Sequence, residues 1–532
     1  MIVRGSPAAC PAFDDALALC RLRRGNSAGL FMRLWKLIPA LAILVSACAS
    51  TTDTMADGQS VADPAKPRPR RVAYKSDPYP STYRPLPADD VMIANATVFD
   101  GLGGQIENGS VLLQGGKIVA VGANIPVPAG VKIIDAKGKW VTPGIIDIHS
   151  HLGVYPSPGL EAHQDGNEAS GPVTADVWAE HGLWPQDPGF TRAMAGGVTA
   201  MEILPGSANL FGGRGVIIKN VPAKTAQGMK FPGAPYTLKM ACGENPKRVY
   251  GYGNGGFPGG KPFSRMGNVA GYRAAWQEAV EYKRKWEKYG ADFDAWEKKA
   301  DHPKKDDDGE PEDPGDAPDA PDRDFRLDTL MGVLNGEILV QQHCYRADEM
   351  AQIIDLSKEF GYKVSAFHHG VEAYKIADLL AANGICGALW ADWWGFKAEA
   401  YDGIRENIPL VHEAGACAIV HSDDANGIQR LNQEAAKALG DGARAGINIS
   451  KAVAWTWLSR NPAKALGILD KTGTLEAGKA ADVVIWSGDP FSVYTRADLV
   501  FVDGAITWDR SDPSRRPVVD FELGQPGEGD VK

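Results

Sequence analysis

The sequence predicts an α/β protein whose main domain is a (β/α)8 TIM barrel, joined to a small composite β-sandwich domain formed from the N- and C-terminal segments. Between residues 144 and 465, short apolar runs alternate with amphipathic stretches that end in Gly, which is typical of βα units with a buried parallel sheet. Residues 88–143 and 466–515 instead carry strand-like runs separated by Gly-rich turns. Because each flank is too small to bury a good core, we expect the two flanks to form one domain.

The composition is that of a globular protein, with 532 residues of which 44% are hydrophobic and 23% are charged. Much of the net charge of −10 lies in residues 306–324, which hold ten acidic residues and one Arg. We interpret residues 300–325 as an acidic, solvated insertion in the barrel domain. No basic stripe occurs along the chain, so we expect no nucleic-acid partner.

The N-terminal segment is predicted to be an export signal. Residues 1–48 form a leader with a lipoprotein-type signal peptide, in which we interpret Met32 as the start of translation. Basic residues precede an apolar run too short to span a bilayer, and small residues then precede Cys48, which would carry the lipid. The alternative is a plain secretory signal with an incidental cysteine.

Residues 49–87 are rich in Pro, Ser, Asp and Lys and are expected to form a tether. The mature protein would then contact the membrane only through its lipid anchor. The predicted location is the periplasm or cell envelope. Ala49 after the cysteine resembles the pattern of outer-membrane lipoproteins.

Four cysteines lie beyond the leader, at positions 242, 344, 386 and 417, without CxxC spacing. Three of them lie in apolar runs that are predicted to be strands. We therefore interpret these residues as buried core thiols rather than as disulfides or metal ligands.

The first signal of chemistry is the segment DIHSH, which closes the apolar run before it. Residues i and i+2 of a strand point to the same face, so His149 and His151 project together. At the carboxyl end of a barrel strand that position is the mouth where active sites form. Two imidazoles placed in this way provide half of a divalent metal site.

Three more candidate ligands end predicted strands. His343 ends EILVQQH, His369 ends KVSAFHH and Asp423 ends ACAIVHSD. The interval from His343 to His369 fits one βα unit, and the interval from His369 to Asp423 fits two. With His149 at strand 1, these residues fit the ends of strands 5, 6 and 8, so they converge on one mouth. The alternative is that each histidine is a hydrogen-bonded core residue.

Several motifs together resemble the amidohydrolase superfamily, close to imidazolonepropionase-like metal-dependent amidohydrolases. They include PGIIDIHSH, GGVTAMEILPGSANLFGGRG, HCYRADE, FHHGVEAYK, HSDD and GTLEAGKAADVVIWSGDP. The resemblance spans about residues 91–510 and leaves out the leader and the acidic insertion.

The resemblance implies a binuclear site that usually holds two Zn²⁺ ions. His149, His151 and Asp423 would bind one metal, and His343 and His369 would bind the other. A lysine at the end of strand 4, carboxylated by carbon dioxide, often bridges the metals in this superfamily, and Lys239 stands at that place. A cationic lysine is a poor ligand and must first lose its proton. Glu244 is the other candidate for the bridging ligand, and the sequence does not distinguish Glu244 from Lys239.

Two neighbouring histidines need separate assignments. The FxH pattern of the family selects His369, so His368 is expected to point away from the site into packing. His421 precedes Asp423 by two residues and is expected to orient it or a bridging water. Trp393 and Trp394 follow strand 7 and either wall a pocket or pack. Five basic residues near loop ends could bind a substrate carboxylate: Arg214, Lys247, Arg248, Arg265 and Arg346.

The expected activity is hydrolysis of an amide or peptide-like C–N bond in a small molecule, with Asp423 as general base and then general acid. One alternative is a mononuclear deaminase, but His343 is followed by Cys, Tyr and Arg without the Glu of an HxxE pattern. The other is a catalytically inactive, ligand-binding lipoprotein. A homo-oligomer is compatible with the sequence.

Overall fold

The computed structural model describes residues 68–252, 261–305 and 307–515. The predicted leader, with Met32 and Cys48, and residues 49–67 of the predicted tether lie outside the described residues. The described residues from 69 onward belong to one compact unit. Within the described part of the chain, no helix is both long and apolar enough to cross a membrane.

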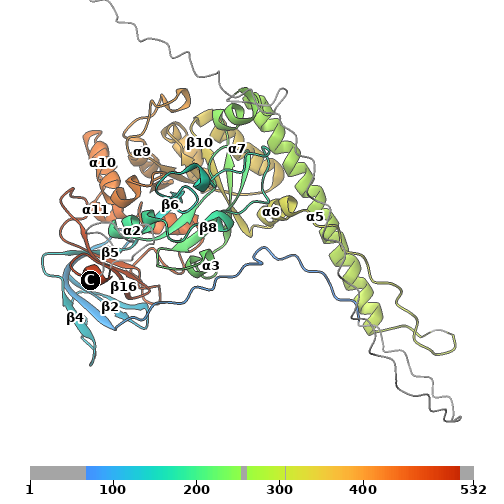
Figure 1. Cartoon of the computed structure of the whole chain (residues 1–532), viewed down its shortest axis with the longest axis horizontal. Coiled ribbons are helices and arrows are strands. Elements are labelled where there is room, and N and C mark those ends of the chain that lie inside the picture. The colour runs from blue at the N-terminus through green and yellow to red at the C-terminus, as the bar shows by residue number, and fades with distance from the viewer. Residues whose placement is uncertain (1–67, 253–260, 306, 516–532) are drawn as a thin grey trace, which may run out of the picture. The chain divides into compact units, whose positions relative to one another are not determined.

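The centre of the molecule is an eight-stranded sheet whose strands follow one another in chain order, as expected for a barrel of successive βα units (Figure 1). This confirms the predicted α/β barrel. The strands are β6 (Ile145–Ser150), β7 (Val198–Ile203), β8 (Phe211–Lys219), β9 (Tyr236–Ala241), β10 (Ile338–Cys344), β11 (Val364–His369), β12 (Cys386–Leu389) and β13 (Cys417–Val420).

One strand departs from the predicted parallel order. β8 pairs antiparallel with both β7 and β9, whereas the other neighbours in this sheet pair parallel. Only residues 204–210 connect β7 to β8, and a parallel crossover needs about a dozen residues or more. β8, the third strand of the barrel sheet, therefore runs antiparallel to β7.

Helices cover the outside of the barrel and supply the apolar partners of its strands. α7 begins after β10 and ends at a left-handed Gly361, which terminates the helix as the sequence pattern predicts. The helices are α1 (Ala179–Gly182), α2 (Pro188–Ala195), α3 (Ala226–Met229), α4 (Glu244–Pro246), α5 (Arg265–Asp301), α6 (Phe325–Leu334), α7 (Ala347–Phe360), α8 (Ala377–Asn383), α9 (Asn407–Glu413), α10 (Leu431–Arg444), α11 (Lys451–Trp455) and α12 (Arg460–Ala465).

The two flanking segments share one mixed sheet, with the order β16-β15-β14-β5-β1-β2-β3 and β4 paired to β1. β5 pairs with β1 on one side and with β14 on the other, so it joins the N-terminal and C-terminal strands. The strands are β1 (Val91–Phe99), β2 (Gln105–Gln114), β3 (Lys117–Gly122), β4 (Lys132–Asp135), β5 (Trp140–Pro143), β14 (Val483–Trp486), β15 (Ala497–Val502) and β16 (Ala505–Asp509).

The described part of the predicted tether has no helix or strand, but it is bound to the folded unit. The Tyr83 hydroxyl donates to Asp503 Oδ2 at 2.6 Å, and Lys230 Nζ lies 2.9 Å from Asp77 Oδ1. The Tyr74 hydroxyl donates to the carbonyl of Asp328 at 2.8 Å. Residues 74–83 are therefore part of the folded structure and not a free linker.

The predicted core thiols are wrong, because the structure pairs the four cysteines as disulfides, Cys242–Cys344 and Cys386–Cys417. Cys386 and Cys417 are register partners on the adjacent strands β12 and β13, with Cα atoms 4.3 Å apart. Cys242 follows β9 and Cys344 ends β10, which are also neighbours. The sequence does not show this pairing, since it depends on strand adjacency and register.

We predict that replacing both Cys386 and Cys417 by Ser lowers the free energy of unfolding by about 2–4 kcal/mol, because the unfolded chain regains entropy when the crosslink is lost. Denaturant unfolding of the variant and the wild type measures this difference. Peptide mapping without reduction should recover both linked pairs, and a free Cys386 thiol in the folded protein would contradict the pairing.

Candidate functional site

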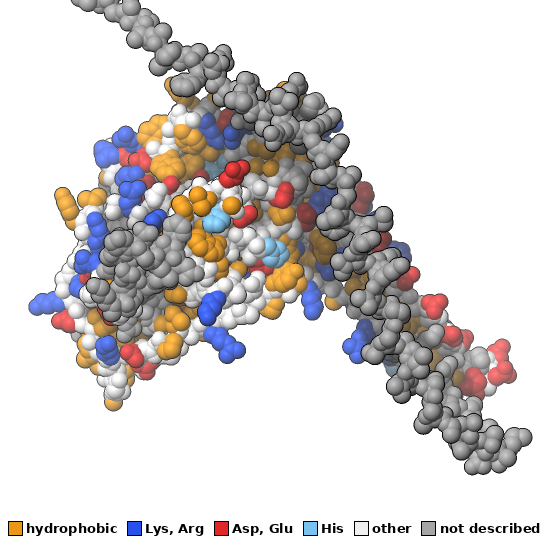
Figure 2. Space-filling view, in the orientation of Figure 1, with side chains coloured by type: hydrophobic (Ala, Val, Ile, Leu, Met, Phe, Trp, Pro, Cys, Tyr) orange, Lys and Arg blue, Asp and Glu red, His pale blue; other side chains and the backbone are white. Residues whose placement is uncertain are grey.

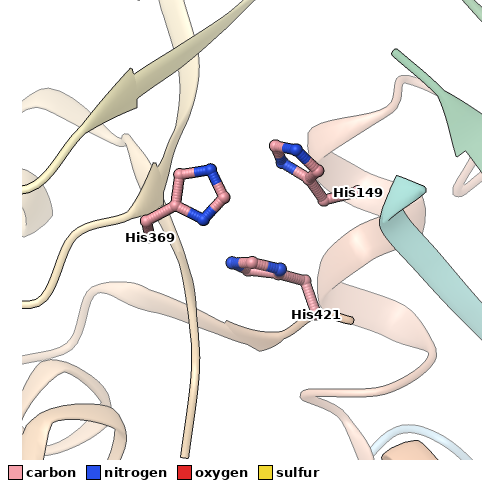
Figure 3. Close-up of side chains that lie close together, drawn as sticks. All are labelled: His149, His369 and His421. Carbon is pink, nitrogen blue, oxygen red and sulfur yellow. The ribbon is translucent and has the colours of Figure 1, made fainter. Parts of the chain in front are cut away.

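The carboxyl end of the barrel gathers a buried cluster of imidazoles around His149, at the end of β6. The ring centroid of His149 lies 5.0 Å from that of His151, 4.6 Å from that of His369 and 5.1 Å from that of His421. The His343 ring joins through His369, at 4.6 Å. In Figure 3 the rings of His149, His369 and His421 point toward one another from three different strand ends.

Asp423 lies among these rings, three residues beyond β13. Its Oδ1 atom is 3.1 Å from His151 Nε2 and 3.4 Å from His149 Nε2. Its Oδ2 atom is 3.7 Å from His369 Nδ1. Burial alone would raise the pKa of Asp423, but the hydrogen bond and charge of His151 outweigh it and hold that pKa below its usual value. The carboxylate is therefore ionised at neutral pH.

The backbone at two of these residues is left-handed, with φ of 72° at His369 and 54° at Asp423. Such φ values are uncommon for residues other than Gly and cluster at functional sites. The effect is clearest on β11. His368 is the register partner of His343, so strand alternation already turns it into the barrel. The left-handed φ then brings the next residue, His369, back to the same site.

The prediction that His368 points away into packing is therefore wrong. Its Nδ1 lies 2.8 Å from His149 Nδ1, and its Nε2 lies 2.8 Å from Gln341 Oε1. An amide oxygen only accepts, so His368 Nε2 carries the proton and donates to Gln341. His368 Nδ1 then accepts from His149 Nδ1–H. This leaves the lone pair on His149 Nε2, which points toward Asp423.

His151 is oriented by the same logic. Its Nδ1 lies 2.8 Å from the backbone carbonyl oxygen of Leu204, which can only accept a hydrogen bond. Nδ1 therefore carries a proton, and the other ring nitrogen, Nε2, faces Asp423 Oδ1 at 3.1 Å.

The cluster has the donor set of a divalent cation site. Burial lowers the pKa of His149, His343 and His369 well below the usual value, and that of His421 to about 3, so these rings are neutral. Within the described residues, His343 Nδ1, His369 Nδ1 and both ring nitrogens of His421 make no hydrogen bond. Two groups each bring their ligand atoms within 4.8 Å of one another: His149, His369 and His421, and His149, His151 and Asp423.

Lys239 lies in this cluster and Glu244 lies at its rim. Lys239 is fully buried, and its Nζ is 3.2 Å from His149 Nε2. Burial lowers the pKa of Lys239 to about 8, against the opposing charges of Asp423 and Glu202, so an uncharged amine fraction is available near neutral pH. The Glu244 carboxylate instead lies 3.7 Å from Lys397 Nζ. The geometry therefore places Lys239, rather than Glu244, inside the histidine cluster.

Sequence reasoning missed Glu202 on β7 and Lys397. Glu202 is fully buried near Lys239, and burial raises the pKa of its carboxyl to about 8. Lys397 Nζ lies 4.1 Å from the Tyr345 ring centroid and 2.8 Å from Asn245 Oδ1. Glu202 lies within the motif GGVTAMEILPGSANLFGGRG, but nothing in the sequence marks either residue as part of the site, which each reaches only through the fold.

Three of the basic residues proposed for a substrate carboxylate have other partners. Arg214 is buried against Trp178 and donates to Thr329. Arg265 is paired with Glu349 and Glu399, and Arg346 is paired with Asp348. Lys247 Nζ lies over the Tyr252 ring, and no described contact places Arg248 at the histidine cluster. In Figure 2, histidine side chains reach the surface among hydrophobic and acidic ones.

Comparisons with known proteins agree with this architecture. A sequence model of the Amidohydrolase family matches residues 341–508. The chain is 33% identical over 420 residues to the amidohydrolase tasK of Hapsidospora irregularis, covering 75% of this chain but 40% of that protein. It is 25% identical over 434 residues to an imidazolonepropionase of Mesorhizobium japonicum, covering 74% of this chain and 90% of that protein.

A solved structure extends the likeness to the fold. The amidohydrolase from Thermotoga maritima MSB8 has a TM-score of 0.68 and 33% sequence identity, over 79% of this chain and 100% of that chain.

We predict that Lys239→Ala lowers the metal content of the purified protein by about half or more, since the variant lacks the buried amine beside His149 Nε2. Glu244→Gln, the matched control at the rim, should keep the wild-type content. Elemental analysis of the purified proteins measures both. Loss of metal from Glu244→Gln together with full content in Lys239→Ala would reverse the assignment.

Proposed function

Because this chain belongs to the amidohydrolase family, we propose that it hydrolyses an amide or peptide-like C–N bond in a small molecule with the help of bound divalent metal. Its family membership makes it a hydrolase. The observation that carries the finer proposal is the largely buried cluster of imidazoles, one lysine and one ionised carboxylate at the barrel mouth. Such a donor set suits Zn²⁺, which prefers imidazole and carboxylate ligands.

In the proposed site, His149, His151 and Asp423 would hold one cation, and His343 and His369 would hold the other. Lys239 would serve as a further ligand once its Nζ is carboxylated. His421 would provide a further imidazole ligand near His149 and His369, because neither of its ring nitrogens makes a hydrogen bond within the described residues. Two cations bound here would lower the pKa of a water toward neutrality and polarise the scissile carbonyl.

Asp423 is the proposed general base and general acid. Its Oδ1 is hydrogen-bonded to His151, while its Oδ2 has only a long contact to His369. The carboxylate accepts a proton from the attacking water and returns it to the leaving nitrogen. The products are a carboxylic acid and an amine. The deaminase alternative gains no support, because Cys344 after His343 is in a disulfide and Arg346 is paired with Asp348.

We also propose that the protein is an exported lipoprotein of the cell envelope, anchored through Cys48. Disulfides persist in oxidising compartments and are rare in the cytosol. Two disulfides in the barrel domain therefore support the export signal that the N-terminal sequence predicts.

We predict that Asp423→Asn keeps bound metal within about a factor of two of wild type but lowers kcat by about 10³-fold or more, because the amide cannot accept the proton of the attacking water. A panel of dipeptides and N-acyl amino acids provides the assay. Asp424→Asn is the matched control, since within the described residues the Asp424 carboxylate accepts only from the backbone N–H groups of Asn426 and Gly427. Undiminished turnover by Asp423→Asn would exclude the proposed role.

A further inference from the structure

A cavity of about 570 Å³ opens beside the histidine cluster, between the loop after β12 and helix α10. Its lining includes Trp390, Trp393, His421, Arg430, Gln433 and Lys437. His421 belongs to both places: it lines the cavity, and its ring lies 5.0 Å from that of His369. The cavity is large enough for one amino-acid residue and borders the proposed site of hydrolysis at His421.

Two stacked tryptophans form one wall of this cavity. Trp390 packs 4.4 Å from the His369 ring and is fixed by its indole N–H, which donates to the carbonyl of Ser422 at 3.3 Å. Trp393 stacks on Trp390, with ring centroids 5.3 Å apart and planes at 27°. Trp393 is 38% exposed, so its side chain offers apolar surface to a bound molecule. A planar aromatic ring is the group that stacks best on such a wall.

Two basic side chains, Lys437 and Arg430, line the cavity, and they differ in their partners. Lys437 Nζ lies 2.9 Å from Asp392 and 2.8 Å from Glu434, so its charge is compensated. The exposed Arg430 side chain makes no hydrogen bond or ion pair with the residues that the structure describes, and its charge acts on the Glu434 carboxylate only at longer range. A guanidinium in this state matches a carboxylate, which it can bind through two hydrogen bonds.

We propose that this cavity is the subsite for an aromatic amino-acid residue with a free carboxylate, whose ring stacks on Trp393 and whose carboxylate pairs with Arg430. The residue's nitrogen then belongs to the scissile bond beside His421. The preferred substrates are N-acylated aromatic amino acids and dipeptides that end in an aromatic residue. This inference rests on the proposed hydrolase function for its substrate class, but its binding part stands independently of turnover.

The test uses ligands without a hydrolysable bond and the metal-loaded full chain. Calorimetry measures binding of 3-phenylpropionate, of 3-cyclohexylpropionate with equal charge and similar size but no planar ring, and of uncharged 3-phenylpropan-1-ol. Wild type should bind the phenyl acid about fivefold tighter than the cyclohexyl acid, and Trp393→Ala should remove that preference. Arg430→Gln should weaken the phenyl acid about tenfold and leave the alcohol unchanged.

Trp394→Ala is the matched control, because this neighbouring tryptophan lies outside the cavity lining and its ring faces Arg405. It should bind all three ligands as the wild type does. Equal affinity of wild type for the phenyl and cyclohexyl acids would overturn the aromatic subsite. If Arg430→Gln binds 3-phenylpropionate as tightly as the wild type, the proposed contact between Arg430 and the carboxylate is wrong. The carboxylate then binds elsewhere, such as at the metal.

Turnover separates the two proposals. With the binding results as expected, kcat/KM for N-acetyl-L-phenylalanine should exceed that for N-acetyl-L-alanine, and Trp393→Ala should reduce the ratio about tenfold. If neither compound is hydrolysed while the binding pattern holds, the hydrolase proposal fails and the subsite stands. Hydrolysis of both at equal rates would overturn the subsite as a determinant of specificity.

Discussion

The fully buried imidazole of His149 is the constraint on which the rest of the site depends. His368 binds one ring nitrogen of this neutral imidazole, and the other ring nitrogen points to Asp423 and Lys239. The same residue closes the barrel, because its carbonyl accepts from the backbone N–H of Asp423 at 3.0 Å. Asp147, two residues earlier, accepts from the backbone N–H of Ser422 at 3.2 Å. β6, the first strand of the barrel, thus positions both the His149 imidazole and the Asp423 carboxylate, which follows β13.

Holding these groups together has a cost that the scaffold must offset. Two site residues adopt left-handed φ, and a carboxyl and an amine are buried near each other at Glu202 and Lys239. Deprotonation of the amine and retention of the carboxyl proton both lower the charge buried there. The disulfide of Cys344 follows His343 directly and ties β10 to β9. This crosslink therefore lies at the carboxyl ends of two strands that carry site residues, whereas Cys386 and Cys417 begin β12 and β13.

Much of this arrangement follows from local sequence pattern, because strand ends and the two-residue period can be read directly. His149 and His151 share a face for that reason, and family motifs identify the barrel and its composite β domain. Other features depend on tertiary context that the pattern does not contain. The antiparallel β8 follows from connection length, the cysteine pairings and the inward His368 follow from strand register, and the return of His369 to the same site follows from its left-handed φ. The roles of Lys397 and Trp390 could not be predicted from the sequence, because they depend on contacts with residues at the ends of other strands.

The central claim is that this histidine cluster binds the metal that the chemistry requires. Anomalous diffraction at the zinc edge, from crystals of the protein grown with zinc and bicarbonate, tests it most directly. The account predicts two anomalous peaks, one within ligand distance of His149, His151 and Asp423 and the other near His343 and His369, with density on Lys239 Nζ between them. Zinc bound only outside this cluster, or a cluster without any peak, would contradict the account.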